Sequence, residues 1–208
     1  MSNIRDFLSS FKKTEVARPC NFDVTIAPTS VSLFSALSLA GLKFGTDPIS
    51  ALKQITLRCE RAELPSRTFS LLAQKIYGPI QLHPYQTSYS LMNLEFLCSD
   101  NMFEKFFFDA WLNYMSNATF FPFPTGAADI VDLFMGNGPV VNYDFQYKND
   151  YESFVLITQY DLKGNASLYS GLFHAFPVAV NDLALSWSST DTAHRLAVTF
   201  AYTYHNTA

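Results

Sequence analysis

Residues 194–204 read HRLAVTFAYTY, and large apolar side chains alternate there with small or polar ones. Because successive side chains of a β-strand point to opposite faces of a sheet, this period of two predicts a strand with one buried face. The expected buried face holds Leu196, Val198, Phe200 and Tyr202, and the expected outer face holds Ala197, Thr199, Ala201 and Thr203. The C-terminal part of the chain is therefore predicted to belong to a sheet.

The same alternation recurs upstream. In residues 89–98 it places Met92, Leu94 and Phe96 inward, and in residues 53–61 it places Ile55, Leu57 and Cys59 on one face. Further strands are predicted over residues 22–26, ending at Pro28, and over residues 69–77, 154–160, 167–175 and 183–187. Some eight strands with few helices predict a mainly β fold, an antiparallel sandwich or small barrel.

One strong helix signal interrupts the strands. It begins at Ser99 or Asp100, either of which can cap a helix, and its apolar residues fall at helical spacing. These residues are Phe103, Phe106, Phe107, Ala110, Trp111 and Tyr114. We expect this flanking helix to lie on the sheet or to close one end of a barrel.

Three segments add to this plan. Ser2 can cap a short N-terminal helix whose apolar face holds Ile4, Phe7, Leu8 and Phe11. Residues 29–48 form a Ser-, Leu- and Ala-rich excursion with a weak helix over 32–40 that Gly41 is expected to stop. Residues 117–149 are turn-rich and longer than a plain connection needs. We therefore expect one domain, residues 1–208, with an N-terminal arm (1–17), an excursion (29–48) and a long loop (117–149).

Composition limits the functional classes. Of the 208 residues 49% are hydrophobic and 15% charged, and the net charge is −4. That charge argues against a protein that grips nucleic acid, because phosphate binding depends on clustered Lys and Arg. No stretch reaches the roughly 20 apolar residues of a membrane helix, and the N-terminus lacks the features of a secretory signal, so we expect folding in the cytoplasm.

Chemical motifs are missing at the spacings that catalysis or metal binding requires. The sequence contains no HExxH, GKS, GKT or GxSxG, and Cys20, Cys59 and Cys98 have no ligand-like spacing. We therefore predict no catalytic, cofactor-binding or metal-binding residues and a protein that is not an enzyme. An enzyme on a β-sandwich ranks last among the alternatives, behind a monomeric barrel that binds a small apolar ligand.

With the strands placed, the order of landmarks resembles the tail tube protein family of contractile phages, whose relatives include tubes of contractile injection systems and baseplate tube initiators. ARPCNFDV (residues 17–24) looks like the family's ARPNxFxV, and ITLRCERAELP (residues 55–65) is similar to its strand ending in a small residue, Leu and Pro. Phe106 and Trp111 match a Phe-x-x-Trp-like element more loosely. Residues 171–178, 183–188 and 196–202 look like the family's GLWP, LxLxW and FxVTLxxxY series.

The resemblance implies a structural virion protein of the phage tail, assembled in the host cytoplasm. Its subunits would stack as hexameric rings around a channel for viral DNA, which passes without specific binding, and for the tape measure protein. Sheath and baseplate proteins would be its other partners, and no cofactor or membrane is implied. Because the excursion and the long loop exceed what a minimal tube subunit needs, a baseplate tube initiator of the same fold is the alternative.

Contacts between rings would need apolar surface that one small domain leaves uncovered. The candidates come from the N-terminal arm and the excursion: Ile4, Phe7, Leu8, Phe11, Leu33, Phe34, Leu37 and Leu39. Each of these segments could instead pack on its own subunit. The polar face formed by Gln54, Thr56, Arg58 and Glu60 on the strand predicted over residues 53–61 could line the channel or face outward.

Overall fold

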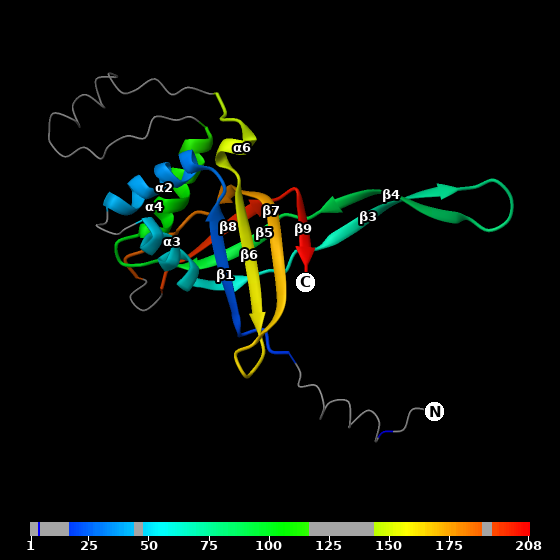
Figure 1. Cartoon of the computed structure of the whole chain (residues 1–208), viewed down its shortest axis with the longest axis horizontal. Helices are drawn as coiled ribbons and strands as arrows, with labels where there is room; N and C mark the ends of the chain where they lie inside the picture. Colours follow the sequence, from blue (N-terminus) through cyan, green and yellow to red (C-terminus); the bar gives the residue numbers. More distant parts are fainter. Residues whose placement is uncertain (1–3, 5–16, 44–47, 117–143, 189–192) are drawn as a thin grey trace.

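The computed structural model of the chain describes residue 4 and residues 17–43, 48–116, 144–188 and 193–208 (Figure 1). A seven-stranded antiparallel sheet has the order β1–β6–β7–β8–β5–β2, and β9 also pairs with β7. The strands are β1 (Phe22–Pro28), β2 (Cys59–Ala62), β5 (Met92–Leu97), β6 (Ser153–Tyr160), β7 (Ala166–Val180), β8 (Arg195–Ala201) and β9 (Tyr204–Thr207). A separate two-stranded hairpin is formed by β3 (Arg67–Gln74) and β4 (Gln81–Tyr89).

The long strand β7 joins the two halves of the sheet. Its first part pairs with β6, with Leu172 opposite Val155, and its last part pairs with β8, with Phe176 opposite Ala201. His174, which lies where the partner changes, has a φ of 55°, an uncommon conformation for a residue other than glycine. His174 Nδ1 lies 2.8 Å from Oε2 of the nearly buried Glu152, which fixes this corner to the start of β6.

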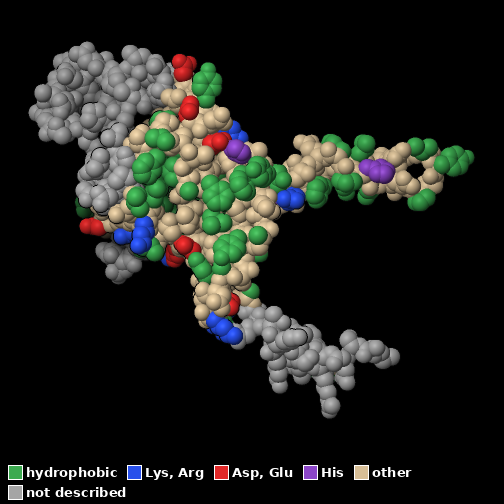
Figure 2. Space-filling view, viewed as in Figure 1, with side chains coloured by type: hydrophobic (Ala, Val, Ile, Leu, Met, Phe, Trp, Pro, Cys, Tyr) green, Lys and Arg blue, Asp and Glu red, His purple; other side chains and the backbone are tan. Residues whose placement is uncertain are grey.

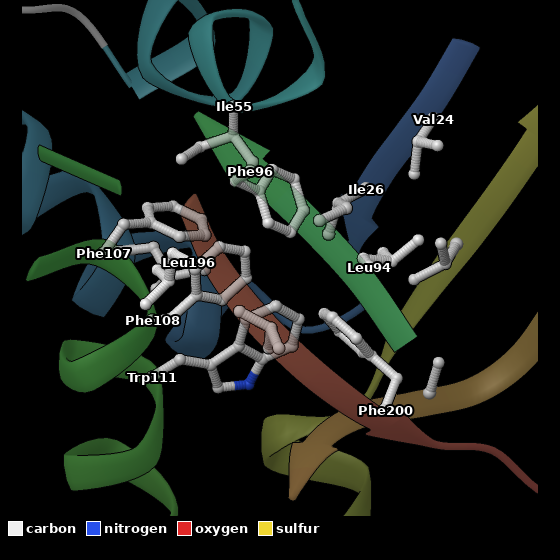
Figure 3. Packing of buried hydrophobic residues seen from close by; sticks show 14 of the residues in the cluster. Val24, Ile26, Ile55, Leu94, Phe96, Phe107, Phe108, Trp111, Leu196 and Phe200 are labelled. Carbon is white, nitrogen blue, oxygen red and sulfur yellow. The ribbon is translucent and has the colours of Figure 1, made fainter. Parts of the chain in front are cut away.

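Helices cover the inner face of the sheet. They are α2 (Val31–Lys43), α3 (Pro48–Leu57), α4 (Phe103–Met115) and the single turn α6 (Lys148–Tyr151). Aromatic rings of α4 meet rings of the sheet: Phe108 lies 4.9 Å from Phe96 between ring centroids, and Trp111 lies 6.0 Å from Phe200 (Figure 3). Trp111 Nε1 also donates a hydrogen bond to the Tyr151 carbonyl at 3.0 Å. The core therefore buries these large rings and provides a hydrogen-bond acceptor for the indole N–H of Trp111.

Much of the plan read from the sequence is confirmed. The fold is mainly β and antiparallel, α4 forms where the helix signal lies, and Met92, Leu94, Phe96, Leu196, Val198 and Phe200 are buried. Ser99 contributes to the start of α4, because its Oγ accepts from Phe103 N at 3.4 Å, although the residue directly before the helix is Met102. No helix in the described ranges is long and apolar enough to span a membrane.

The strand predicted over residues 53–61 is wrong. Residues 48–57 form α3, and only Cys59–Ala62 form a strand. Ala51 and Ile55, four residues apart on one helical face, are buried, whereas Leu57 is 74% exposed. Pro48 favours this helix because the first helical position needs no N–H donor. The period-two pattern of Ile55, Leu57 and Cys59 is thus a coincidence of composition.

The excursion also differs from its prediction. Helix α2 runs to Lys43 and passes through Gly41 without stopping, and Ser30 Oγ accepts from Leu33 N at 3.1 Å at its start. Residues 183–186, predicted as part of a strand, have no regular structure, and Trp187 after them is fully exposed. Of the long loop, residues 117–143 lie outside the described residues. Strand β4 was not predicted at all.

Candidate assembly surface

The β3–β4 hairpin, residues 67–89, projects from the body as a narrow arm (Figure 1). We call residues 67–89 the hairpin arm and the rest of the described chain the body. The two strands pair from Arg67 opposite Tyr89 to Gln74 opposite Gln81, with one irregularity between Ser70 and Leu71. The turn at the tip contains Gly78 with a φ of 81°, which glycine adopts without strain. Pairing of the two strands is thus the main interaction that orders the hairpin arm.

The hairpin arm exposes large apolar side chains along its whole length (Figure 2). Eight of them are more than half exposed: Phe69, Leu71, Leu72, Ile76, Tyr77, Ile80, Leu82 and Tyr85. An isolated two-stranded hairpin is only marginally stable in water, and an apolar hairpin with free edges is a template for association. Surface of this kind on an otherwise folded domain marks an interaction site.

The charge of the hairpin arm is opposite in sign to that of the body. Arg67 and Lys75 are its charged residues at neutral pH, and residues 67–89 contain no Asp or Glu. The hairpin arm carries +2 out of a chain total of −4, which leaves −6 on all other residues. A second copy of the chain therefore presents a surface of complementary overall charge to the hairpin arm.

The base of the hairpin arm is held by a cluster that we call the arm root: Arg67, Tyr89, Tyr202 and His205. Arg67 Nη2 donates a hydrogen bond to the His205 carbonyl at 3.2 Å, and the guanidinium lies 5.7 Å from the centroid of the Tyr89 ring. The rings of Tyr89, Tyr202 and His205 meet pairwise at 5.3–6.0 Å. Burial raises the pKa of Tyr202. The arm root ties the hairpin arm to the C-terminal strand β9.

The residues predicted for ring contacts fall into three groups. Leu33 and Leu37 are buried in the core of their own subunit, so in this structure they offer no surface to another ring. Phe34 is half-buried and Ile4 is 75% exposed. Phe7, Leu8, Phe11 and the side chain of Leu39 lie outside what the structure describes.

The sequence analysis predicted a strand over residues 69–77 but missed its partner β4, and with it the hairpin arm. The turn residues were a usable signal, since Gly and Pro between two β-forming segments predict a hairpin. Pro84 obscured the second strand, but it pairs with Leu71 at the irregularity, where a missing N–H is tolerated.

The polar face proposed for residues 54–60 does not exist as one surface, because α3 and β2 divide it. Arg58 Nε instead lies 3.1 Å from Oε1 of the fully buried Glu104. Glu60 pairs with Arg195 at 2.6 Å, and this hydrogen bond lowers the pKa of the Glu60 carboxyl. Both ion pairs fasten β2 and the residue before it to the rest of the body.

The described part of the chain contains no cluster of side chains suited to a metal ion, because no group of three or more His, Cys, Asp or Glu residues there is arranged to hold one. All three cysteines are free thiols, and burial raises the pKa of Cys59 to about 12, which makes it a poor nucleophile. Cys20 is exposed, whereas Cys59 and Cys98 are half-buried.

A family model described as phage tail tube protein matches residues 17–208. The chain therefore belongs to the phage tail tube protein family. No curated protein sequence matches the chain.

Solved structures support the same fold at low sequence identity. A chain of the sheath–tube complex of an extracellular contractile injection system in its extended state aligns with a TM-score of 0.51 and 10% identity, covering 96% of both chains. A chain of the sheath/tube terminator of that system aligns with a TM-score of 0.51 and 9% identity, covering 94% of this chain and 98% of the other. A chain of the anti-feeding prophage cap aligns with a TM-score of 0.51 and 11% identity, covering 94% of this chain and 92% of the other. The family and these neighbours are structural tube proteins and not enzymes.

Proposed function

We propose that this chain is the tail tube subunit of a contractile phage tail. It assembles into stacked hexameric rings whose channel carries viral DNA and the tape measure protein, with the sheath outside and the baseplate at one end. Assembly takes place in the host cytoplasm, and the mature location is the virion tail. The observation that carries this proposal is the hairpin arm, an ordered apolar element that its own subunit leaves uncovered.

The energetics of the hairpin arm favour association with a second copy. Covering eight large side chains that are each at least half exposed contributes on the order of 10 kcal/mol before the costs of association. Those costs are of the same order for one contact, so a single arm gives a weak dimer at most. A closed ring and a stack of rings repeat the contact, and a head-to-tail arrangement of this kind extends along an axis.

The charge of the chain suits a channel that releases DNA. A net charge of −6 outside the hairpin arm repels phosphates, so DNA can slide past without being held.

Ring-to-ring contacts through Ile4, Phe7, Leu8, Phe11, Phe34 and Leu39 belong to the same proposal, alongside the hairpin arm.

A small-ligand barrel fits the structure less well. Aromatic and aliphatic side chains fill the space between the sheet and the helices. An apolar hollow between β1 and β2, lined by Pro19, Phe22, Ala62, Leu64, Ile157 and Gln159, has a volume of about 120 Å³. Ligand pockets usually measure at least ~300 Å³.

A baseplate tube initiator of the same fold is the alternative to a tube subunit. The two are distinguished by whether purified rings stack.

The test is negative-stain electron microscopy of the purified full-length chain together with light-scattering mass at increasing concentration. We expect sixfold rings and hollow tubes. Single rings that never stack would favour the initiator. A monomer of 23.4 kDa at every concentration would contradict the assembly proposal.

A further inference from the structure

The arm root contains a histidine in an unusual setting. His205 is 9% exposed, and its Nδ1 atom is buried without a hydrogen-bond partner among the described residues. Its ring meets Tyr89 edge-on at 5.3 Å and Tyr202 at 6.0 Å. A neutral imidazole tolerates this aromatic setting, whereas an imidazolium has two N–H donors that both need acceptors.

The charges around His205 disfavour a second positive charge. Arg67 of β3 donates to the His205 carbonyl, Tyr89 comes from β4, and Tyr202 comes from the segment between β8 and β9. In the described part of the chain no ion pair joins a carboxylate to Arg67 or His205. A proton on His205 would therefore add a like charge beside Arg67 with no acid to offset it.

His174 shows the opposite arrangement a short distance away in the fold. It is also aromatic-flanked, lying 5.9 Å from Tyr204, but its Nδ1 is 2.8 Å from the Glu152 carboxylate. Of these two histidines, only His174 has a carboxylate paired with it among the described residues.

Because His205 lies in the arm root, a loss of packing around it would affect how the hairpin arm is attached to the body. Beyond the two chain connections, the hairpin arm is tied to the body through the contacts of Arg67 and Tyr89 with Tyr202 and β9. Next to them, Ser66 Oγ and Ser90 Oγ form a 2.7 Å hydrogen bond across the two connecting segments. Weakening the arm root would free the hairpin arm to change its angle to the body while leaving the buried core in place.

We propose that the arm root is a proton-sensitive latch, in which protonation of His205 releases the hairpin arm from the body and weakens assembly between copies of this chain. The inference rests on the proposed function, since it assigns a regulation to the same hairpin arm. It makes tube growth favourable at neutral pH and unfavourable in mildly acidic solution.

The direction of the pH effect follows from linkage. Burial and then the neighbouring Arg67 lower the pKa of His205 below its usual value of 6.5. The folded arm root thus binds a proton less readily than the released one. Its stability is complete above pH 6.5 and falls as the pH drops from 6.5 through the lowered pKa.

The test measures the critical concentration for assembly of the full-length chain by light scattering between pH 7.5 and 5.0. For the wild type we expect a rise of at least tenfold over this range. His205→Phe keeps an aromatic ring between Tyr89 and Tyr202 but cannot be protonated, so we expect a change below twofold. His194→Gln removes a histidine outside the arm root and should retain the wild-type response.

Three outcomes would decide the question. A wild type that assembles equally well at both pH values, or a His205→Phe variant that keeps the tenfold response, would overturn the latch while leaving the tube proposal standing. Failure to assemble at any pH would instead overturn the proposed function. If His205→Phe does not fold, amide exchange of the wild type decides, because the latch requires residues 202–207 to lose protection at pH 5.0 before the core residues of α4 do.

Discussion

The body and the hairpin arm use the same kinds of side chain in opposite ways. In the body, Phe96, Phe108 and Trp111 are fully buried; the ring of Phe96 meets that of Phe108, and the ring of Trp111 meets that of Phe200. In the hairpin arm, Phe69 is 53% exposed and Tyr77 is entirely exposed. The body therefore has the packing of a domain that folds alone, whereas the hairpin arm has the composition of an interface without its partner. Stability and assembly should respond to different sets of residues.

The largest loss of stability is expected from truncating the body's core. Trp111→Ala removes a fully buried ring, its contact with Phe200 and its hydrogen bond to the Tyr151 carbonyl. We expect the free energy of unfolding to fall by about 3–5 kcal/mol, as measured by urea denaturation at a concentration where the chain is monomeric. A loss below 1 kcal/mol would mean that α4 is not part of the cooperative core.

A smaller loss is expected at the buried carboxylate of α4. Glu104 Oε2 accepts from Ser99 N and Ser99 Oγ, both at 2.7 Å, and Oε1 faces Arg58. Glu104→Gln removes the charge that pairs with Arg58, whose side chain is 37% exposed, so water compensates part of the loss. We expect the free energy of unfolding to fall by about 2 kcal/mol, measured by urea denaturation. Lys105→Gln, which breaks a half-exposed pair with Asp109, is the matched control and should lower the free energy of unfolding by at most about 0.5 kcal/mol.

A still smaller effect is expected on the outer face of β7. A Cβ atom added at Gly171 would lie 3.0 Å from two atoms of the Phe154 ring. Phe154 is only half-buried and its ring can shift, although it packs against Phe173 at 5.0 Å. Gly171→Ala should therefore cost about 1 kcal/mol, read from the urea midpoint. Phe154→Ala in the same chain should abolish the penalty of the added methyl group, and a persistent penalty would point to backbone strain instead.

The smallest effect on stability is expected in the hairpin arm. Leu71→Ser and Leu72→Ser together should change the free energy of unfolding of the monomer by at most about 0.5 kcal/mol, because both side chains already contact water. The same pair should raise the critical concentration for assembly strongly. Leu162→Ser, at a turn residue that is 47% exposed, provides the control for a general change in surface polarity. A pair of arm substitutions that unfolds the monomer would show that the hairpin arm supports the body.

The best-predicted elements are those in which one face is buried, because burial of that face sets the spacing of apolar side chains in the sequence. Strands β5 and β8 pair directly, with Leu94 opposite Val198, and both patterns were readable because each inward residue meets the core. Helix α4 was readable for the same reason. Helix α3 was misread because Leu57 and Cys59 extend the spacing of Ile55 at period two, although Leu57 faces water. Short apolar runs carry this ambiguity between helix and strand.

The candidate site was the least predictable part. Leu33 and Leu37 were proposed as contacts because a Leu-rich segment looked like surplus apolar surface, but α2 delivers both to the core. Only the first strand of the hairpin arm was predicted, over residues 69–77, and β4 was missed. The large apolar side chains of the hairpin arm are exposed in the subunit, so they follow no single buried face that a pattern within the chain could reveal. The spacing of apolar residues along the sequence reflects packing inside a subunit more directly than packing between subunits.

The most direct test of the account replaces residues 68–88 with a short Gly-Ser linker and compares this chain with the wild type by sedimentation velocity and urea denaturation. Arg67 and Tyr89 remain in place, so the arm root is retained. We predict a monomer whose cooperative unfolding matches that of the wild-type monomer but which forms no rings or tubes at any concentration. Rings formed without the hairpin arm would contradict the claim that this element drives assembly.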